Sequence, residues 1–340
     1  MRPLRILASF HHYLPRHSCG AEHMAHTINK YLVKQGHHVR VIIHQAYQYN
    51  ISQPYFYEGV EVMPPPTRIQ EAFLWADIVI THLDYTQFTV EMCDKNNRPC
   101  IHLKHNDTHY KSIEVAKKGN HGVIFNSKWM AEAEKGRYPH PSMIMYPPVD
   151  VDQYNVCPNP AGNKFVTLIN LNEDKGGKIF SRIAAAMPEK QFLGVKGYHK
   201  QFYRQLPNLT ILDNTPDILP VYAQTRILLM LSRYESWGRT ATEAMCNGIP
   251  VICTPTKGLM ENCGGAALYV NERHDLIEFD GVDPLDDAET YDISKVIAQI
   301  RKLDRPNFYE ACSDRARERA EQLRPDKQLK EFEQFMFNML

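Results

Sequence analysis

A strand–turn–helix pattern in the second half of the chain constrains the fold more than any other feature. An apolar run at 226–231 precedes the polar stretch 235–243 (ESWGRTATE), and Gly248 separates this stretch from another apolar run at 249–252. Continuous apolar runs of this length are typical of buried parallel strands, and a glycine commonly ends a helix. The pattern predicts a strand, a polar turn, a helix and a second parallel strand.

Two carboxylates, Glu235 and Glu243, lie on either side of the expected helix start. The free backbone N–H groups of a helix N-terminus favour an anion such as a diphosphate. A carboxylate repels phosphate but accepts hydrogen bonds from sugar hydroxyls, so the combination predicts a nucleotide sugar as ligand. The alternative is ordinary helix capping, because acidic residues near a helix N-terminus stabilise the helix dipole by up to about 1 kcal/mol.

This segment closely resembles the donor-binding segment of retaining glycosyltransferases of the GT-B fold, family-4 type (glycosyl transferases group 1). The resemblance implies that Glu235 contacts the donor sugar and that Glu243 holds the ribose. It also implies that the diphosphate meets the backbone between them, at Ser236, Trp237, Gly238, Arg239 and Thr240. The fold implied is α/β, with two Rossmann-like doubly wound domains that face a cleft and a C-terminal crossover helix.

Length and composition agree with a two-domain globular protein. A chain of 340 residues is long for one core, and its 43% apolar content includes no run near the ~20 residues of a membrane span. A net charge of zero argues against general nucleic-acid binding. The eight cysteines lack C-x-x-C spacing, and the N-terminus lacks a signal-peptide pattern, so we expect a cytoplasmic protein.

Strand and helix patterns alternate along both halves of the chain, which predicts two doubly wound parallel sheets. The stretch 146–150 (YPPVD) interrupts the alternation and reads as a hinge. We therefore expect an N-terminal acceptor-side domain at 1–150, a donor domain at 151–325 and a crossover helix at 326–340 that packs back on the first domain.

A second candidate phosphate site is the turn at 172–177, where Lys175 precedes two glycines. A lysine there could neutralise phosphate, although an ordinary strand-to-helix turn is equally compatible with the spacing. The family resemblance implies a diphosphate-binding role for Lys175. The family arginine five positions earlier is Asn170 here, so one cationic contact is either absent or supplied by Arg239 or Lys178.

Other positions follow from the resemblance alone. Gly20 matches the second glycine of a Gly-Gly-x-Glu segment, whose first glycine is Cys19 here, and is expected near the donor diphosphate. His105 and Asp107 match a His-Asp element near the reacting sugar. The acceptor side is therefore expected to include His105, Asp107 and His109. Asn214 falls where the nucleotide base is expected, and Ser127 is expected to cap a helix.

Histidine is distributed unevenly, since all but two of the 16 histidines precede position 141. His105 and His109 are four residues apart, which suits zinc only if both lie on one helix. A loop is expected there instead, so no metal site is predicted.

The family resemblance implies a retaining, metal-independent hexosyltransferase. His105, Lys175 and Glu235 are its expected catalytic residues. The donor is a nucleoside diphosphate sugar, and the acceptor is a glycan, a lipid-linked sugar or a small molecule. A lipid-linked acceptor would bring peripheral membrane contact. Two alternatives remain open: a GT-B sugar-nucleotide epimerase and a non-catalytic nucleotide-sugar binding protein.

Overall fold

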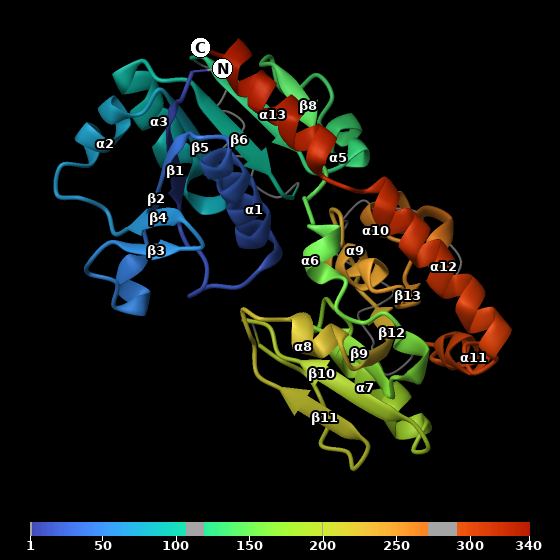
Figure 1. Cartoon of the computed structure of the whole chain (residues 1–340). Helices are drawn as coiled ribbons and strands as arrows, with labels where there is room; N and C mark the ends of the chain where they lie inside the picture. Colours follow the sequence, from blue (N-terminus) through green and yellow to red (C-terminus); the bar gives the residue numbers. More distant parts are fainter. Residues whose placement is uncertain (1, 107–118, 199, 271–290) are drawn as a thin grey trace. The chain divides into compact units, whose positions relative to one another are not determined.

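The computed structural model describes residues 2–106, 119–198, 200–270 and 291–340 (Figure 1). Contacts within the chain divide it into two compact units. Unit 1 comprises Met1–Pro148 and Pro325–Leu340, and unit 2 comprises Val149–Arg324. Each unit is built around one sheet.

The sheet of unit 1 has eight strands in the described part of the chain. In pairing order they are β3 (Tyr55–Tyr57), β4 (Val60–Met63), β2 (His38–Ile43), β1 (Arg5–Phe10), β5 (Ile78–His82), β6 (Cys100–Lys104), β7 (His121–Phe125) and β8 (Ser142–Ile144). Strand β3 pairs antiparallel with β4 at one edge, whereas β1 pairs parallel with both of its neighbours.

Helices cover both faces of this sheet because residues along its central strands alternate between two cores. In β1, Ile6 and Ala8 belong to the core beneath α1 (Gly20–Lys34), whereas Leu7 belongs to the core beneath α2 (Ile69–Trp75) and α3 (Thr86–Asn96). A sheet with apolar residues on both faces must be covered on both, as in other doubly wound proteins. A short helix, α5 (Lys128–Ala133), follows β7.

The terminal helix α13 (Asp326–Asn338) completes the core of unit 1. Its residues Leu329, Phe332 and Met336 are buried in the same core as β1 and α1. Glu333 fixes the helix further, because Tyr31 donates a hydrogen bond to it over 2.9 Å and a ring nitrogen of His37 lies 3.1 Å away. Helix α13 occupies the segment where a crossover helix was expected, and it belongs to the core of unit 1.

Unit 2 repeats the architecture with a six-stranded sheet in the described residues. In pairing order its strands are β11 (Leu209–Leu212), β10 (Gln191–Val195), β9 (Phe165–Ile169), β12 (Thr225–Met230), β13 (Val251–Cys253) and β14 (Leu268–Tyr269). The helices are α6 (Val151–Tyr154), α7 (Gly177–Ala186), α8 (Leu219–Tyr222), α9 (Arg239–Cys246), α10 (Lys257–Cys263), α11 (Ser294–Lys302) and α12 (Pro306–Gln322).

Each sheet has one topological switch point, where successive connections change direction. In unit 1 the chain runs outward from β1 through β2, then returns to β5 and runs the other way. In unit 2 the corresponding strands are β9 and β12. Ligands of doubly wound sheets bind beyond the carboxyl ends of the strands at such points. The fold therefore indicates two candidate ligand-binding sites, one in each unit.

The fold class expected from the sequence is confirmed, and strands β12 and β13 fall on the apolar runs at 226–231 and 249–252. The short edge strands β3 and β14 were not predicted. Ser127 takes the N-cap position of α5, but the expected capping bond is wrong: its hydroxyl donates to the Asn126 side chain instead. In the described residues, no helix is both long and apolar enough to cross a membrane.

Candidate functional site

Two polar turns meet at the switch point of unit 2. The turn after β9 carries Lys175 and the turn after β12 carries Glu235, and the lysine Nζ lies 2.5 Å from the glutamate Oε1. The Ser232 hydroxyl donates to the same oxygen over 2.8 Å, and the backbone N–H of Arg233 donates to the Asp174 carbonyl over 2.8 Å. A cation and a carboxylate are therefore held side by side, with both side chains partly exposed.

Glycine gives both turns their shape. Gly176 (φ 86°) and Gly238 (φ 83°) adopt left-handed backbone conformations as the N-cap residues of α7 and α9. A Cβ on Gly176 would lie 2.6 Å from the Cβ of Leu231, so the Lys-Gly turn packs directly on the end of β12. Because glycine has no side chain to cap a helix, the first-turn N–H groups of both helices can face an anion.

A third glycine, Gly258 in α10, was not singled out from the sequence. A Cβ there would lie 2.2 Å from the carbonyl oxygen of Glu235 and 2.6 Å from the carbonyl carbon of Ser236. The first turn of α10 thus supports the backbone of the polar turn. A close approach between segments distant in the sequence leaves no local pattern that could have indicated it.

Glu243 lies on α9 with both carboxylate oxygens engaged. Arg239 Nε donates to Oε1 over 2.6 Å, and the Tyr222 hydroxyl donates to Oε2 over 2.7 Å. Burial and the adjacent Glu243 charge hold the pKa of Tyr222 well above its ordinary value, so the phenol keeps its proton. Arg239 also lies 3.3 Å from the hydroxyl of Tyr154. A carboxylate offers about four acceptor positions, so each oxygen could still accept a ribose hydroxyl.

The remaining predicted donor residues occupy distinct environments. Ser236 and Thr240 are half-buried, whereas Trp237 and Arg239 are buried. Lys178, the other proposed cationic contact, pairs with Glu173 on the protein itself. The Asn214 side chain donates to the Lys196 carbonyl over 3.3 Å.

The departure at Asn170 has a backbone explanation. Its φ of 73° is left-handed, a conformation that asparagine tolerates better than most residues. Its side-chain oxygen accepts the N–H of Asn172 over 3.3 Å. Asn170 therefore shapes the start of the Lys-Gly turn.

In unit 1 the predicted residues lie near the carboxyl edge of the sheet. Gly20 begins α1 and would carry a Cβ without a clash, since no other atom lies within 4 Å. His105 directly follows β6, its ring nitrogen lies 3.1 Å from His82, and its carbonyl accepts a hydrogen bond from Asn126. Asp107 and His109 lie outside the described residues.

Imidazoles in this part of unit 1 are kept neutral. Burial first, and the neighbouring His11 second, lower the pKa of His105 to about 3 and that of His44 to about 4. The pKa of His82 lies well below its ordinary value because of burial and four nearby histidines. At neutral pH His105 is therefore a hydrogen-bonding group rather than a cation.

Residues 171–265 match the family model described as glycosyl transferases group 1. The matched segment contains both polar turns, helix α9 and Gly258. Over this segment, the chain is similar to the glycosyl transferases of group 1. No curated protein is similar enough in sequence to count as a match.

Solved glycosyltransferase structures share the fold over nearly the whole chain. HepE from Anabaena, in complex with UDP-glucose, is 16% identical with a TM-score of 0.74, covering 99% of this chain and 100% of that one. The pneumococcal O-GlcNAc transferase GtfA, with UDP and GlcNAc, is 10% identical with a TM-score of 0.71, covering 99% of each chain. Sucrose-phosphate synthase from Thermosynechococcus elongatus is 15% identical with a TM-score of 0.71, covering 98% of each chain.

Proposed function

We propose that this protein transfers a hexose from a nucleoside diphosphate sugar to a glycan, lipid-linked or small-molecule acceptor, with retention of configuration. The observation that carries the proposal is the Lys175–Glu235 pair at the switch point of unit 2, beside two glycine-capped helix N-termini. This arrangement offers positive potential for a diphosphate and an acceptor oxygen for sugar hydroxyls within one turn of chain.

The proposed roles follow from the chemistry of each group. Lys175 and the N-terminus of α9 would stabilise the negative charge that develops on the departing diphosphate, which is electrostatic catalysis. When the diphosphate binds the ammonium group of Lys175, the Glu235 carboxylate would lose its ion pair and accept hydrogen bonds from the sugar hydroxyls instead. Glu243, held by Arg239 and Tyr222, would accept hydrogen bonds from the ribose hydroxyls.

Several solved structures of this fold contain a nucleotide and a sugar, joined or separate. UDP-glucose is bound to HepE, UDP and GlcNAc to GtfA, and ADP and acarbose to Starch Synthase IV from Arabidopsis thaliana. These proteins differ in sugar and in base, so the proposal names the class of donor and leaves the particular one to experiment.

Unit 1 would supply the acceptor side, with His105 at the carboxyl edge of its sheet. A neutral imidazole can accept a proton or a hydrogen bond from an acceptor hydroxyl. Since Lys175 and the helix N-terminus provide the positive charge, the donor diphosphate requires no divalent metal in this proposal.

A thermal-shift screen with UDP, GDP, ADP and TDP and their glucose derivatives tests the donor half of the proposal. A ligand present at 100 times its Kd stabilises a protein by about 2.7 kcal/mol, which gives a clear rise in Tm. The Lys175→Ala variant should lose the response. If no nucleotide raises the Tm of the native chain, the proposed donor site is wrong.

Product analysis then separates transfer from other reactions of a nucleotide sugar. The donor that gives the largest shift is incubated alone and with an acceptor panel. Glycosylated acceptor with the anomeric configuration of the donor supports the proposal. An isomerised sugar from donor alone would indicate an epimerase, and donor binding without any turnover would indicate a binding protein.

A further inference from the structure

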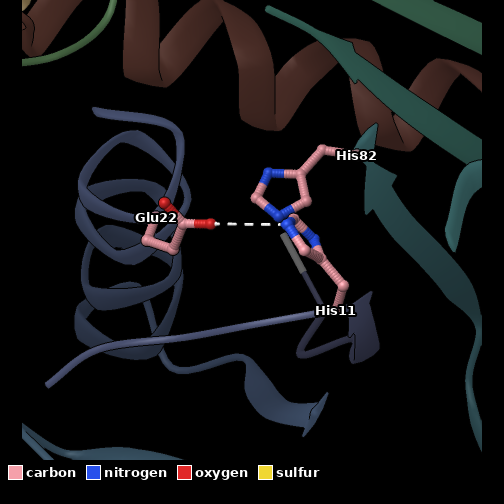
Figure 2. Close-up of side chains that lie close together, drawn as sticks. All are labelled: His11, Glu22 and His82. Atoms are coloured by element: carbon pink, nitrogen blue, oxygen red, sulfur yellow. Dashed lines mark ion pairs between the residues drawn. The ribbon is translucent and has the colours of Figure 1, made fainter. Parts of the chain in front are cut away.

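Three buried side chains converge at the switch point of unit 1, next to His105 and two residues beyond Gly20. His11 directly follows β1, His82 ends β5, and Glu22 lies in the first turn of α1. One potential ligand atom from each lies within 4.8 Å of the other two. Figure 2 shows the Glu22 carboxylate reaching from the helix toward the two imidazole rings, with its Oε1 4.0 Å from His11 Nε2.

Burial makes this convergence unusual. His11 is 7% exposed, Glu22 is 1% exposed and His82 is fully buried. Among the described residues, Glu22 Oε2 and His82 Nε2 have no hydrogen-bond partner. A buried polar atom without a partner is costly, and its retention calls for an explanation such as an ion.

The other nitrogen of His82 is already oriented. Its Nδ1 lies 3.1 Å from His105 Nε2. If Nδ1 carries the proton and donates it to His105, the lone pair of Nε2 is free to point toward His11 and Glu22. Histidines that bind metals are typically held in this way by a partner on the second ring nitrogen.

The backbone beside His82 supports the same conclusion. Leu83, which follows it directly, has a φ of 52°, a left-handed conformation that a leucine rarely adopts. Strained backbone of this kind concentrates at functional sites, where neighbouring structure holds it in place.

We propose that His11, Glu22 and His82 form a binding site for Zn²⁺ or a similar divalent transition-metal ion, with an open fourth position for water or a hydroxyl group. Two imidazoles with one carboxylate suit such ions, whereas Mg²⁺ and Ca²⁺ prefer sites made of oxygen ligands. A doubly charged cation also compensates a buried carboxylate. The site goes beyond the proposed transfer reaction and does not depend on it.

The geometry requires only small adjustments. In a tetrahedral zinc site with bonds of about 2.0–2.1 Å, ligand atoms are about 3.4 Å apart. The three ligand atoms here lie within 4.8 Å of one another, so side-chain rotations could bring them into range. His82 lies in β5 and Glu22 in α1, so two of the three side chains are anchored in regular structure, and His11 directly follows β1.

A second cluster shares Glu22 and is the main competitor. It consists of His17, Cys19 and Glu22, where His17 and Cys19 are half-buried. Both ring nitrogens of His17 already have partners, the Tyr49 hydroxyl at 3.0 Å and the Cys19 sulfur at 3.5 Å. His82 has one nitrogen without such a partner, which favours the His11–Glu22–His82 cluster.

Metal titration of the full chain tests the proposal. Protein stripped with a chelator and then freed of it is titrated with Zn²⁺ against a competing dye, and separately with Co²⁺. We expect one Zn²⁺ per chain and a Co²⁺ visible spectrum of four-coordinate type without a thiolate charge-transfer band. That near-ultraviolet band would instead place the metal on Cys19 and overturn the assignment, as would the absence of stoichiometric binding.

Variants locate the site. His82→Gln and Glu22→Gln should each weaken Zn²⁺ binding at least tenfold, whereas Cys19→Ser and His38→Gln, the latter at an exposed histidine, should leave it unchanged. Equal binding by all four variants would refute the site. If His82→Gln or Glu22→Gln fails to fold, the Co²⁺ spectrum of the native chain still shows whether the metal is bound without a thiolate ligand. The readout is metal binding, so a failed donor screen leaves the result valid.

Discussion

The two units share a topology but place different chemistry at their switch points. Beyond β9 and β12, unit 2 has a lysine–glutamate pair and two helix N-termini that begin after left-handed glycines. Beyond β1 and β5, unit 1 has buried imidazoles around one carboxylate. All but two of the protein's 16 histidines precede position 141, in the range of unit 1.

With the two proposed sites, one fold would serve two kinds of ligand. The crevice at a switch point is a property of the topology, whereas its ligand depends on the residues that follow the strands. Charged and backbone donors suit a phosphate in unit 2. Neutral nitrogen ligands suit a hydroxyl group or a metal ion in unit 1.

The largest expected effect comes from removing the cation of unit 2. Lys175→Ala should lower kcat by about 10²–10³-fold, the loss typical when one stabilising group at a developing negative charge is removed. Steady-state kinetics with the donor found by thermal shift would measure it. Stability should change little, because a partly exposed ion pair contributes at most about 1 kcal/mol.

Lys190 provides the matched control for that variant. Its side chain is 25% exposed and pairs with Asp304, compared with 28% for Lys175 paired with Glu235. Lys190→Ala should retain full activity. A similar loss in both variants would mean that the effect is not specific to the switch point.

The next effect tests whether backbone packing holds the polar turn of unit 2. Gly258→Ala would force its Cβ to 2.2 Å from the Glu235 carbonyl oxygen, so the turn must shift. We expect a loss of about 1–3 kcal/mol in the free energy of unfolding, together with weaker nucleotide binding, as for other overpacked sites. Urea denaturation and calorimetry would measure the two effects.

Gly265 is the control, because a Cβ there would meet nothing within 4 Å. Gly265→Ala should change stability by no more than about 0.5 kcal/mol. If Gly258→Ala binds nucleotide like the native chain, the support assigned to α10 is wrong.

Acid should distinguish the two units, because unit 1 holds imidazoles neutral. The pKa of His44 is about 4 in the folded chain, compared with an ordinary value of 6.5. Below pH 6.5 the His44 imidazole binds a proton in the unfolded chain but stays neutral in the folded chain. The stability that this group contributes is therefore present at neutral pH and declines as the pH falls toward 4. Between pH 7 and pH 5 we expect this one group to lower the free energy of unfolding by about 2 kcal/mol.

Hydrogen exchange followed by mass spectrometry at pH 7 and pH 5, corrected for intrinsic rates, resolves the loss by unit. Protection should fall more in unit 1 than in unit 2. The His44 ring nitrogen Nε2 lies 2.8 Å from the Ser9 hydroxyl. In His44→Gln, whose amide can also bond Ser9, part of this pH dependence should disappear. Equal loss in both units would contradict the comparison.

The smallest effect concerns the hydrogen bond that orients Glu243. Tyr222→Phe removes a 2.7 Å bond to a buried carboxylate, which should cost about 1–2 kcal/mol and weaken nucleotide binding. Tyr31→Phe removes the comparable bond to Glu333 in unit 1, where the tyrosine is half-buried, and should cost less. Thermal unfolding of both variants would show which loses more stability; a larger loss in Tyr31→Phe would contradict the expectation.

Much of the fold could be predicted from local patterns. The apolar run before Glu235 and the glycine after α9 fixed the order strand, turn, helix and strand, because each signal acts over a few residues. The apolar stripe of α13 likewise indicated that it needed a partner. The edge strand β3 could not be predicted in this way, since three residues carry too little periodicity.

The candidate donor site was predictable as a set of residues but not as a set of contacts. Lys175 and Glu235 were both identified from their turns, yet the 2.5 Å approach between them depends on β9 and β12 being neighbours. Tyr222, Tyr154 and Gly258 were missed because each reaches the site from a distant segment. The zinc proposal has the same origin, since His11, Glu22 and His82 share no motif.

By itself, the sequence determined which segments are strands and helices and which turns carry charge, because backbone propensity, apolar periodicity and glycine conformation are local properties. Only the tertiary structure decided which turns meet and which side chains lose water. Strand order sets the neighbours of each turn, and burial sets the protonation of each imidazole. For that reason the lysine–glutamate pair of unit 2 was foreseeable in kind, whereas the histidine–glutamate cluster of unit 1 became visible only once β1, β5 and α1 were brought together.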